Sequence, residues 1–278
     1  MATIRVVTDS GADLDPLVCS RRAISVVPLD VRLGDLELDV TRSWSAEDFW
    51  HNCANTSALP ETSAPSPGAF AETFDRLSGG SDGVVCVTLS SKLSATYQAA
   101  VAGAEAVAGR VPVKVVDSLS VTMGEGLCVL AAADAADGGA DLDEAAAAAA
   151  AAVAAIQVFG ALDTLENLRK GGRVGGAQAL VGSLLSIKPV ITVRDGVVES
   201  ESRQRTRGRS LRYLADKVDA AGQIRRLAVV HADAPDLDDF LSLLGDSHGD
   251  IPVSYIGPVI GTHCGPGTIG VCFELSAP

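Results

Sequence analysis

Aromatic side chains are scarce in this sequence: phenylalanine, tryptophan and tyrosine together make up 4% of its 278 residues. Apolar residues nevertheless reach 47%, and many of them are alanine. A chain of this length can bury a sizeable core, and its length is typical of about two domains. The composition therefore predicts a globular protein with layered aliphatic packing and little aromatic stacking.

Positive charge is also in short supply, with 22 lysines and arginines against 35 acidic residues and a net charge of -13. Contact with phosphates needs local positive potential, so we expect no nucleic-acid partner and no binding to an anionic membrane surface. The alanine-rich run 145–156 is shorter than the ~20 apolar residues that cross a bilayer. The N-terminal residues lack the basic segment and apolar core of a secretory signal. We expect no integral membrane segment.

The six cysteines form no C-x-x-C pair, and no histidine stands at zinc-ligand spacing. Several cysteines fall in apolar runs, which predicts buried free thiols in a reducing compartment, and hence a cytoplasmic protein without a metal site. Nucleotide motifs are missing too. There is no Walker A sequence, and the G-x-G-x-x-G at 265–270 leads into a strand instead of a helix. We therefore expect no cofactor.

Strands and helices alternate through the first half of the chain. Ile4–Thr8, Val84–Leu89 and Val113–Val116 are short, mostly apolar runs typical of buried strands, and helical patterns separate them. Each run ends in acidic or hydroxyl residues, at Asp9-Ser10, Ser90-Ser91 and Asp117-Ser118. Such alternation predicts a parallel sheet covered on both faces, with ligands bound at the carboxyl ends of its strands.

The pattern changes near Gln157. Ile187–Val193 and Gly196–Ser200 are strand-like runs joined at Asp195-Gly196, which indicates a hairpin and antiparallel sheet in the second half. We also expect a helix over Ala177–Leu185. The sequence thus predicts an α/β fold whose pattern changes in mid-chain.

Four hydroxyl residues crowd the corner between the strand Val84–Leu89 and the helix that follows it: Ser90, Ser91, Ser94 and Thr96. The first turn of a helix has unpaired N–H groups and partial positive charge, so these hydroxyls could help to hold an anion. Ser94 could equally be a simple N-cap. Thr62 and Ser63 lie in the segment Asn55–Pro67, which is rich in proline, serine and threonine and predicts a surface loop.

Two further features have alternative explanations. His263 lies in the glycine-rich segment GTHCGPG, where a predicted turn lets backbone and imidazole approach a carboxylate, although the histidine could instead bond its own backbone. Five arginines lie within ten residues, at positions 203, 205, 207, 209 and 212. They are either a solvated helix end or a contact for an anion or a partner.

Several segments form an ordered set along nearly the whole chain: TDSGADL, VVPLDV, TSAPS, SSKLSATYQAA, VVDS, TLENLRKGGRV, LLSIKPVI, the Q-R-T-R segment and GTHCGPGTIGV. Together they resemble the DegV family of fatty-acid-binding proteins. The resemblance implies a parallel α/β/α domain over residues 1–157 and a two-layer α/β domain with a mixed sheet over residues 158–278, with a long-chain fatty acid between them. It also implies the role of a lipid-binding subunit, whose bound carboxyl group a separate ATP-binding fatty acid kinase subunit phosphorylates to an acyl phosphate.

By the same resemblance, Thr62, Ser94 and His263 would hold the carboxylate, and Arg205 would contact the phosphate or the kinase subunit. Ser63, Ser91 and Arg173 are secondary candidates for the same site. The sequence departs from the family pattern at Ala95, where glycine is usual, and at Ala64, where a polar residue is common. The extra methyl group of Ala95 could shift the helix start and change the carboxylate geometry.

Two other functions fit the residues. One is a serine hydrolase or acyltransferase with Ser94 as nucleophile, His263 as base and Asp9 or Asp117 as the orienting carboxylate. These residues are far apart in sequence but could meet in the fold. The other is a regulatory protein that senses a lipid signal.

Overall fold

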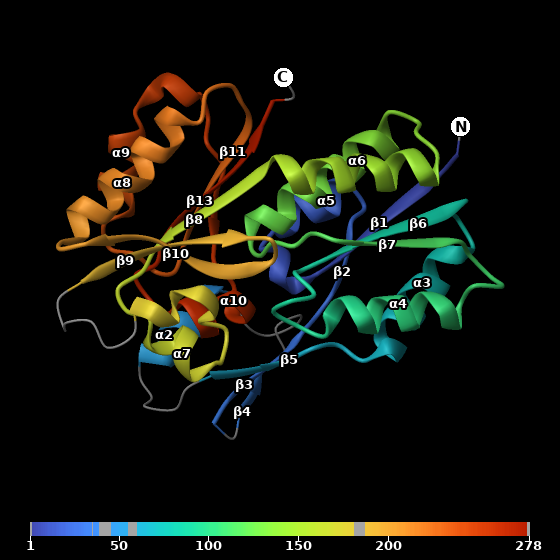
Figure 1. The fold of residues 1–278 in the computed structure, drawn as a ribbon. Helices are drawn as coiled ribbons and strands as arrows, with labels where there is room; N and C mark the ends of the chain where they lie inside the picture. The colour runs from blue at the N-terminus through green and yellow to red at the C-terminus, as the bar shows by residue number, and fades with distance from the viewer. Residues whose placement is uncertain (1, 35, 39–45, 55–59, 181–186, 277–278) are drawn as a thin grey trace.

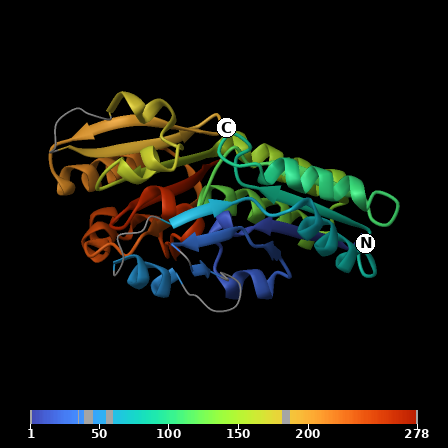
Figure 2. The ribbon, with the colours of Figure 1, turned by 90° about the horizontal axis from the view of Figure 1, so that it is seen from below.

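The computed structural model describes residues 2–34, 36–38, 46–54, 60–180 and 187–276. These residues form two large sheets that lie side by side, with a small third sheet beneath them (Figures 1 and 2). None of the described helices is long and apolar enough to cross a membrane.

The first large sheet has four strands, all parallel, as the alternation of strands and helices predicts. In spatial order they are β2 (Ser25–Val27), β1 (Ile4–Asp9), β6 (Gly83–Thr88) and β7 (Val113–Asp117). Every residue of β6 is buried, because helices cover both faces of the sheet. Val84 and Cys86 pack with Phe70 on one face, while the side chains of Val85 and Val87 enter the core on the other.

Two pairs of helices provide this cover (Figure 1). One face packs against α3 (Pro67–Ser78) and α4 (Thr96–Ala106), and the other against α5 (Met123–Asp137) and α6 (Leu142–Ala155). Alanine dominates α6 and much of α5, so these two helices approach the sheet and each other closely without large side chains. A capping box at Asp141 and Glu144 begins α6.

The second large sheet is mixed and begins where α6 ends. Its strands in spatial order are β10 (Val197–Gln204), β9 (Lys188–Arg194), β8 (Ile156–Ala161), β13 (Ile269–Leu275), β11 (Ile224–His231) and β12 (Val253–Tyr255). All neighbours are antiparallel except β11 and β12. The predicted hairpin at Asp195-Gly196 is confirmed, with both residues at positive φ.

Alternate residues of this sheet enter different cores. Phe159 and Ala161 of β8 pack with residues of α8 (Arg207–Ala220) and α9 (Leu237–Leu244) on the outer face. Val158 and Leu162 share the other core with residues from the first half of the chain. The inner face of the second sheet therefore packs against segments from the first half of the chain.

The third sheet corrects the loop predicted around Thr62 and Ser63. These residues lie in β5 (Pro60–Ser63), which pairs antiparallel with β3 (Asp30–Leu33), itself paired with β4 (Leu36–Leu38). The sequence around β5 has no apolar alternation because none of its four side chains is buried, and the strand is defined by its pairing with β3. Of the predicted loop, residues 55–59 lie outside the described ranges.

The remaining elements are short. They are α1 (Pro16–Arg21), α2 (Ala46–Ala54), α7 (Glu166–Lys170), α10 (Pro258–Cys264) and the 3-10 turns Ser10–Ala12, Gly175–Leu180 and Asp246–His248. The predicted turn around His263 is wrong, because this residue lies in the last turn of α10. Of the helix predicted over Ala177–Leu185, residues 177–180 form part of a 3-10 turn, and residues 181–185 lie outside the described ranges.

Candidate functional site: an apolar cavity with one polar end

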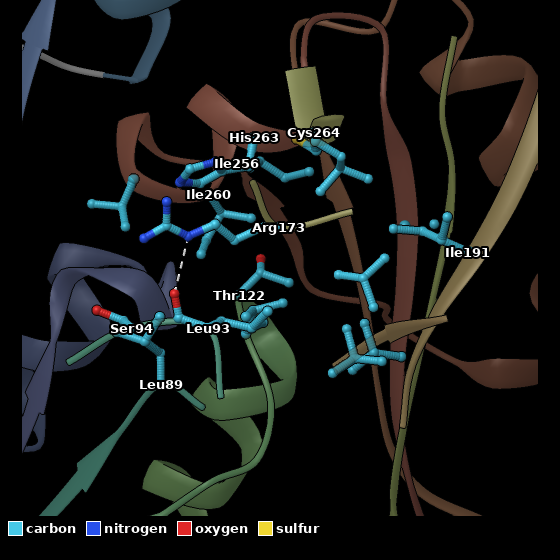
Figure 3. Close-up of a pocket in the computed structure, with 18 of the residues that line it drawn as sticks. Leu89, Leu93, Ser94, Thr122, Arg173, Ile191, Ile256, Ile260, His263 and Cys264 are labelled. Atoms are coloured by element: carbon cyan, nitrogen blue, oxygen red, sulfur yellow. Dashed lines mark hydrogen bonds between the residues drawn. The ribbon is translucent and has the colours of Figure 1, made fainter. Parts of the chain in front are cut away.

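A cavity of about 250 Å³ lies between the two large sheets. Leucine, isoleucine and valine side chains from both halves of the chain form most of its wall, among them Leu89, Leu93, Val121, Leu162, Ile191, Val198, Val230, Ile256 and Ile260. In Figure 3 Leu89 and Leu93 lie on one side of this space and Ile191 lies on the other. The cavity therefore offers an apolar surface for a ligand that is itself mostly apolar.

Five of the residues singled out in the sequence line this one cavity: Thr62, Ser63, Ser94, Arg173 and His263. They come from β5, the turn before α4, the segment after α7 and the last turn of α10. Elements from both halves of the chain thus bring hydroxyl, imidazole and guanidinium groups to the wall of a mostly apolar space.

The imidazole of His263 is bound to Thr62. Its Nε2 lies 3.1 Å from Thr62 Oγ1, although the two residues are 201 positions apart in the sequence. Burial lowers the pKa of His263 to about 4, and the nearby charge of Arg173 acts in the same direction. The ring is therefore neutral at pH 7, with one N–H donor. Its Nδ1 atom is buried and has no hydrogen-bond partner among the described residues.

Arg173 contributes the positive charge of the site. Its Nε donates to the carbonyl of Leu93 at 3.1 Å, drawn as a dashed line in Figure 3, and Nη1 donates to the carbonyl of Gly171 at 2.6 Å. These two bonds hold the side chain of a residue from the second half against the turn that carries Ser94. Within the described ranges no carboxylate pairs with Arg173, so its charge is open to an anionic ligand.

Ser94 lies at the start of α4 and lines the cavity as well. Its Oγ lies 2.8 Å from Thr96 Oγ1 and accepts from the backbone N–H of Thr96 at 3.3 Å. The N-cap itself is Ala95, which makes no side-chain cap and has an ordinary φ of −78°. Any L-residue adopts this conformation, so Ala95 in place of the usual glycine needs no change in the backbone.

Two candidates do not reach the cavity wall. Ser91 donates its backbone N–H to Asp117 at 3.1 Å, which ties the ends of β6 and β7 together. Arg205 is exposed in the turn before α8, and no hydrogen bond or ion pair to the rest of the described chain involves it. Its neighbour Arg207 differs, because both arms of the guanidinium hold Asp236, at 2.8 and 2.9 Å.

Three buried carboxyl groups behind the site were not identified as a cluster from the sequence. Asp9 accepts from the N–H groups of Gly11 and Leu89, and Glu125 accepts from Thr8 Oγ1. Burial raises the pKa of Asp9 to about 7 and that of Glu125 well above its usual value. Glu125 could have been noticed, because it is the one charged residue in the otherwise apolar first turns of α5.

Asp13 completes this cluster and holds α10 in place. Its Oδ1 accepts from the N–H of Gly257, the N-cap of the helix that carries His263. Burial raises the pKa of Asp13 to about 7, against the opposing effect of the Thr122 hydroxyl and the Gly257 N–H. The loop after β1 therefore positions the helix that bears the imidazole, which no local sequence signal reveals.

Gly171 is a second residue whose role appears only in the fold. Gly171 is the C-cap of α7, which ends at Lys170. A Cβ at this position would lie 2.4 Å from His263 Nδ1, so the absence of a side chain lets the ring pack directly on the backbone.

A hydrolytic triad is not assembled. In the described structure His263 Nδ1 has no partner, whereas a catalytic base needs an orienting carboxylate there. Asp9 is engaged by backbone N–H groups, and Asp117 accepts from Ser91 and Leu119. In the described ranges no three or more histidine, cysteine or acidic side chains are arranged so that they could hold a metal ion. The arrangement suits binding of an anionic head group instead.

Residues 3–276 match a family described as "Uncharacterised protein, DegV family". The chain belongs to the DegV family. Among curated DegV relatives, a DegV domain-containing protein of Streptomyces coelicolor is 39% identical over 277 residues, covering 96% of this chain and 97% of its own length. A second DegV domain-containing protein, from Listeria monocytogenes, is 34% identical and covers 98% of both chains.

Solved DegV structures share the whole fold. A DegV family protein from Thermus thermophilus, described by its fatty acid binding, is 31% identical, with a TM-score of 0.90 over 99% of this chain and 100% of its own. DegV from Bacillus subtilis, described as a fatty acid binding protein, is 26% identical, with a TM-score of 0.86 over 99% and 100%. The parallel sheet and the mixed sheet of this chain are thus the DegV architecture.

Proposed function

We propose that this protein binds a long-chain fatty acid in the cavity and presents its carboxyl group to a separate ATP-dependent kinase subunit, which converts it to an acyl phosphate. The observation that carries the proposal is the polar group of Thr62, Ser94, Arg173 and His263 on the wall of a mostly apolar cavity. Fatty acid binding by the DegV proteins of Thermus thermophilus and Bacillus subtilis supports it.

The apolar wall supplies the affinity. Each buried methylene contributes about 0.8 kcal/mol, so a chain of roughly fifteen contributes on the order of 12 kcal/mol before the cost of ordering the chain. The sheets already hold the wall residues in place, so little of this binding free energy is needed to order the protein around the ligand.

The polar group makes entry of the carboxylate possible. An ionised carboxylate loses several kcal/mol when it leaves water without partners. The guanidinium of Arg173 supplies an unpaired charge, and Ser94, Thr62 and the neutral ring of His263 supply donors. Ser63 is exposed at the edge of this group and donates to Asp30 at 3.4 Å, so we assign it a secondary role.

The direct test is to identify what the purified protein carries. Protein expressed in a bacterial host should release a fatty acid on denaturing extraction, detected by mass spectrometry in near-stoichiometric amount. Delipidated protein should take up added palmitate or oleate. Recovery of no lipid in repeated preparations, together with no uptake, would refute the proposal.

In this proposal Arg205 acts when the carboxyl group of the fatty acid is presented to the kinase subunit. Its side chain is exposed and has no hydrogen bond or ion pair in the described structure. A planar guanidinium suits two phosphate oxygens or an acidic partner surface, and neither is present when free fatty acid binds. Arg205→Ala should therefore leave fatty-acid affinity unchanged and sharply reduce acyl-phosphate formation with the kinase subunit and ATP. Lysine at this position should restore only part of the activity, because its ammonium group carries the charge but lacks the planar pair of N–H donors of a guanidinium.

Arg76→Ala is the matched control, since Arg76 is an exposed arginine on α3, against the other sheet. It should change neither measurement. If Arg205→Ala weakens binding and phosphorylation in equal proportion, Arg205 belongs to the carboxylate site and the division of roles is wrong.

A further inference from the structure

The inner face of the six-stranded sheet lacks side chains at two directly paired positions. Gly160 of β8 lies opposite Gly270 of β13 in the antiparallel register, and both residues line the cavity. Directly opposed residues of two antiparallel strands face the same side of a sheet. The two glycines therefore leave one continuous hollow in the sheet.

The alternation of residues along each strand shows that this hollow opens toward the cavity. Val158 and Leu162, two positions on either side of Gly160, belong to the core around the cavity, whereas Phe159 and Ala161 pack toward α8 and α9. Likewise Cys272, two positions after Gly270, belongs to the cavity side. Since side chains alternate with a period of two, the missing side chains of both glycines point inward.

The hollow lies across the cavity from the polar group. Gly160 pairs with Ile191 of β9 on its other side. In Figure 3 Ile191 lies on the opposite side of the cavity from Ser94 and Arg173. A ligand whose carboxylate is held at the polar group would extend its tail in this direction.

The two glycines differ in what the protein itself requires. Neither has a positive φ, so the backbone does not demand glycine at either position. A Cβ at Gly270 would lie 2.9 Å from Val230 Cγ2 and 3.1 Å from the carbonyl oxygen of Phe159, so packing excludes it. A Cβ at Gly160 would lie 3.3 Å from Leu162 Cδ1, the end of a flexible side chain, and 3.6 Å from Ile191 Cγ1.

A methyl group at Gly160 therefore fits if the flexible end of Leu162 moves by a few tenths of an ångström. Glycine in a strand interior is destabilising, so its presence here calls for another reason. Glycine inside a strand often marks a close approach by a ligand. On the basis of the proposed function, we infer that the hollow over Gly160 and Gly270 receives the methyl end of the fatty acid and sets the longest chain that the protein accepts.

The test compares a short and a long saturated fatty acid on delipidated protein. Dissociation constants for myristate and stearate are measured by titration calorimetry for the parent and for Gly160→Ala. The added methyl group occupies the hollow, so the stearate affinity should fall by about tenfold or more relative to the myristate affinity. Retained myristate binding shows at the same time that the variant is folded.

Two further variants complete the comparison. Ile191→Val removes a methyl group beside the hollow and should shift the ratio in the opposite direction, toward the longer acid. Gly109→Ala adds a methyl group at an exposed turn where no atom lies within 4 Å, and it should leave the ratio unchanged. If Gly160→Ala does not fold, the ratio measured for Ile191→Val decides.

The outcomes separate this inference from the proposed function. A parent protein that binds neither acid refutes the fatty-acid function itself. A parent that binds both, with an unchanged ratio in Gly160→Ala or an equal loss for the two acids, refutes the role of the hollow and leaves fatty-acid binding intact. An unchanged ratio in Ile191→Val would contradict it as well.

Discussion

Gly171 offers a way to move the imidazole of the site without removing it. A Cβ at this position would lie 2.4 Å from His263 Nδ1 and 3.0 Å from Cε1. Non-bonded contacts of this kind are ordinarily about 3.5 Å, so Gly171→Ala requires the ring or the backbone to move by roughly 1 Å. The backbone at Gly171 has φ −75° and ψ −5°, which alanine adopts readily, so the strain falls on the contact with the ring.

The size of the effect follows from the bonds that this displacement breaks. The 3.1 Å contact between His263 and Thr62 would lengthen, and the ring would leave its place beside the ligand carboxylate. A hydrogen bond to a charged group contributes about 1.5–3 kcal/mol, which corresponds to a roughly 10- to 150-fold change in the dissociation constant. Palmitate binding to Gly171→Ala should weaken by an amount in this range.

A double-mutant cycle shows whether the loss passes through His263. Calorimetric affinities are measured for Gly171→Ala, His263→Ala and the double variant, with Gly109→Ala as the control for a glycine to alanine change. If Gly171 acts by positioning the ring, the double variant should bind like His263→Ala alone. Nitrogen NMR of the His263 ring should also show an altered pKa in Gly171→Ala. Additive losses, or an unchanged ring signal, would refute the reasoning.

Three other perturbations test the framework and the head-group contacts. Arg207→Ala leaves Asp236 without its two hydrogen bonds from the guanidinium and should lower the free energy of unfolding by about 2 kcal/mol in denaturant titrations. An unchanged free energy of unfolding would show that this ion pair does not stabilise the fold. Asp13 has a pKa raised to about 7 from 3.8, so its contribution to stability is full below about pH 4 and is lost as the pH rises through 7. The melting temperature of the parent should therefore fall between about pH 4 and pH 7 and level off above pH 7, and an equally steep fall in Asp13→Asn would assign the effect to other groups. Ser94→Ala should weaken palmitate binding by about 1.5–3 kcal/mol with little change in melting temperature, and parent-like affinity would place the carboxylate away from Ser94.

Much of the fold follows from local patterns in the sequence. The run Val84–Leu89 is almost continuously apolar because both faces of its strand are covered, and the hairpin at Asp195-Gly196 requires residues that tolerate positive φ. These features depend on a few neighbouring residues, so they are visible without a fold. The parallel first sheet and the antiparallel pairing of the second half were predicted on this basis and are confirmed. The division of the chain at residue 157 stays a prediction.

The site could be predicted only in part, because its contacts join distant segments. The sequence predicts a loop at Thr62, because the strand β5 is defined only by its pairing with β3. The contact between Thr62 and His263 spans 201 positions. The five arginines look alike in the sequence, but Asp236 pairs with Arg207 and leaves Arg205 exposed.

The sequence by itself thus determined the elements and the residue types available for a carboxylate site, because periodicity and turn chemistry act over short distances. Tertiary structure alone decided which of those residues share a cavity, that burial and Arg173 keep His263 neutral, and that Gly160 meets Gly270 across two strands. Burial, charge proximity and strand register are properties of segments far apart in the chain, so only the folded molecule contains them.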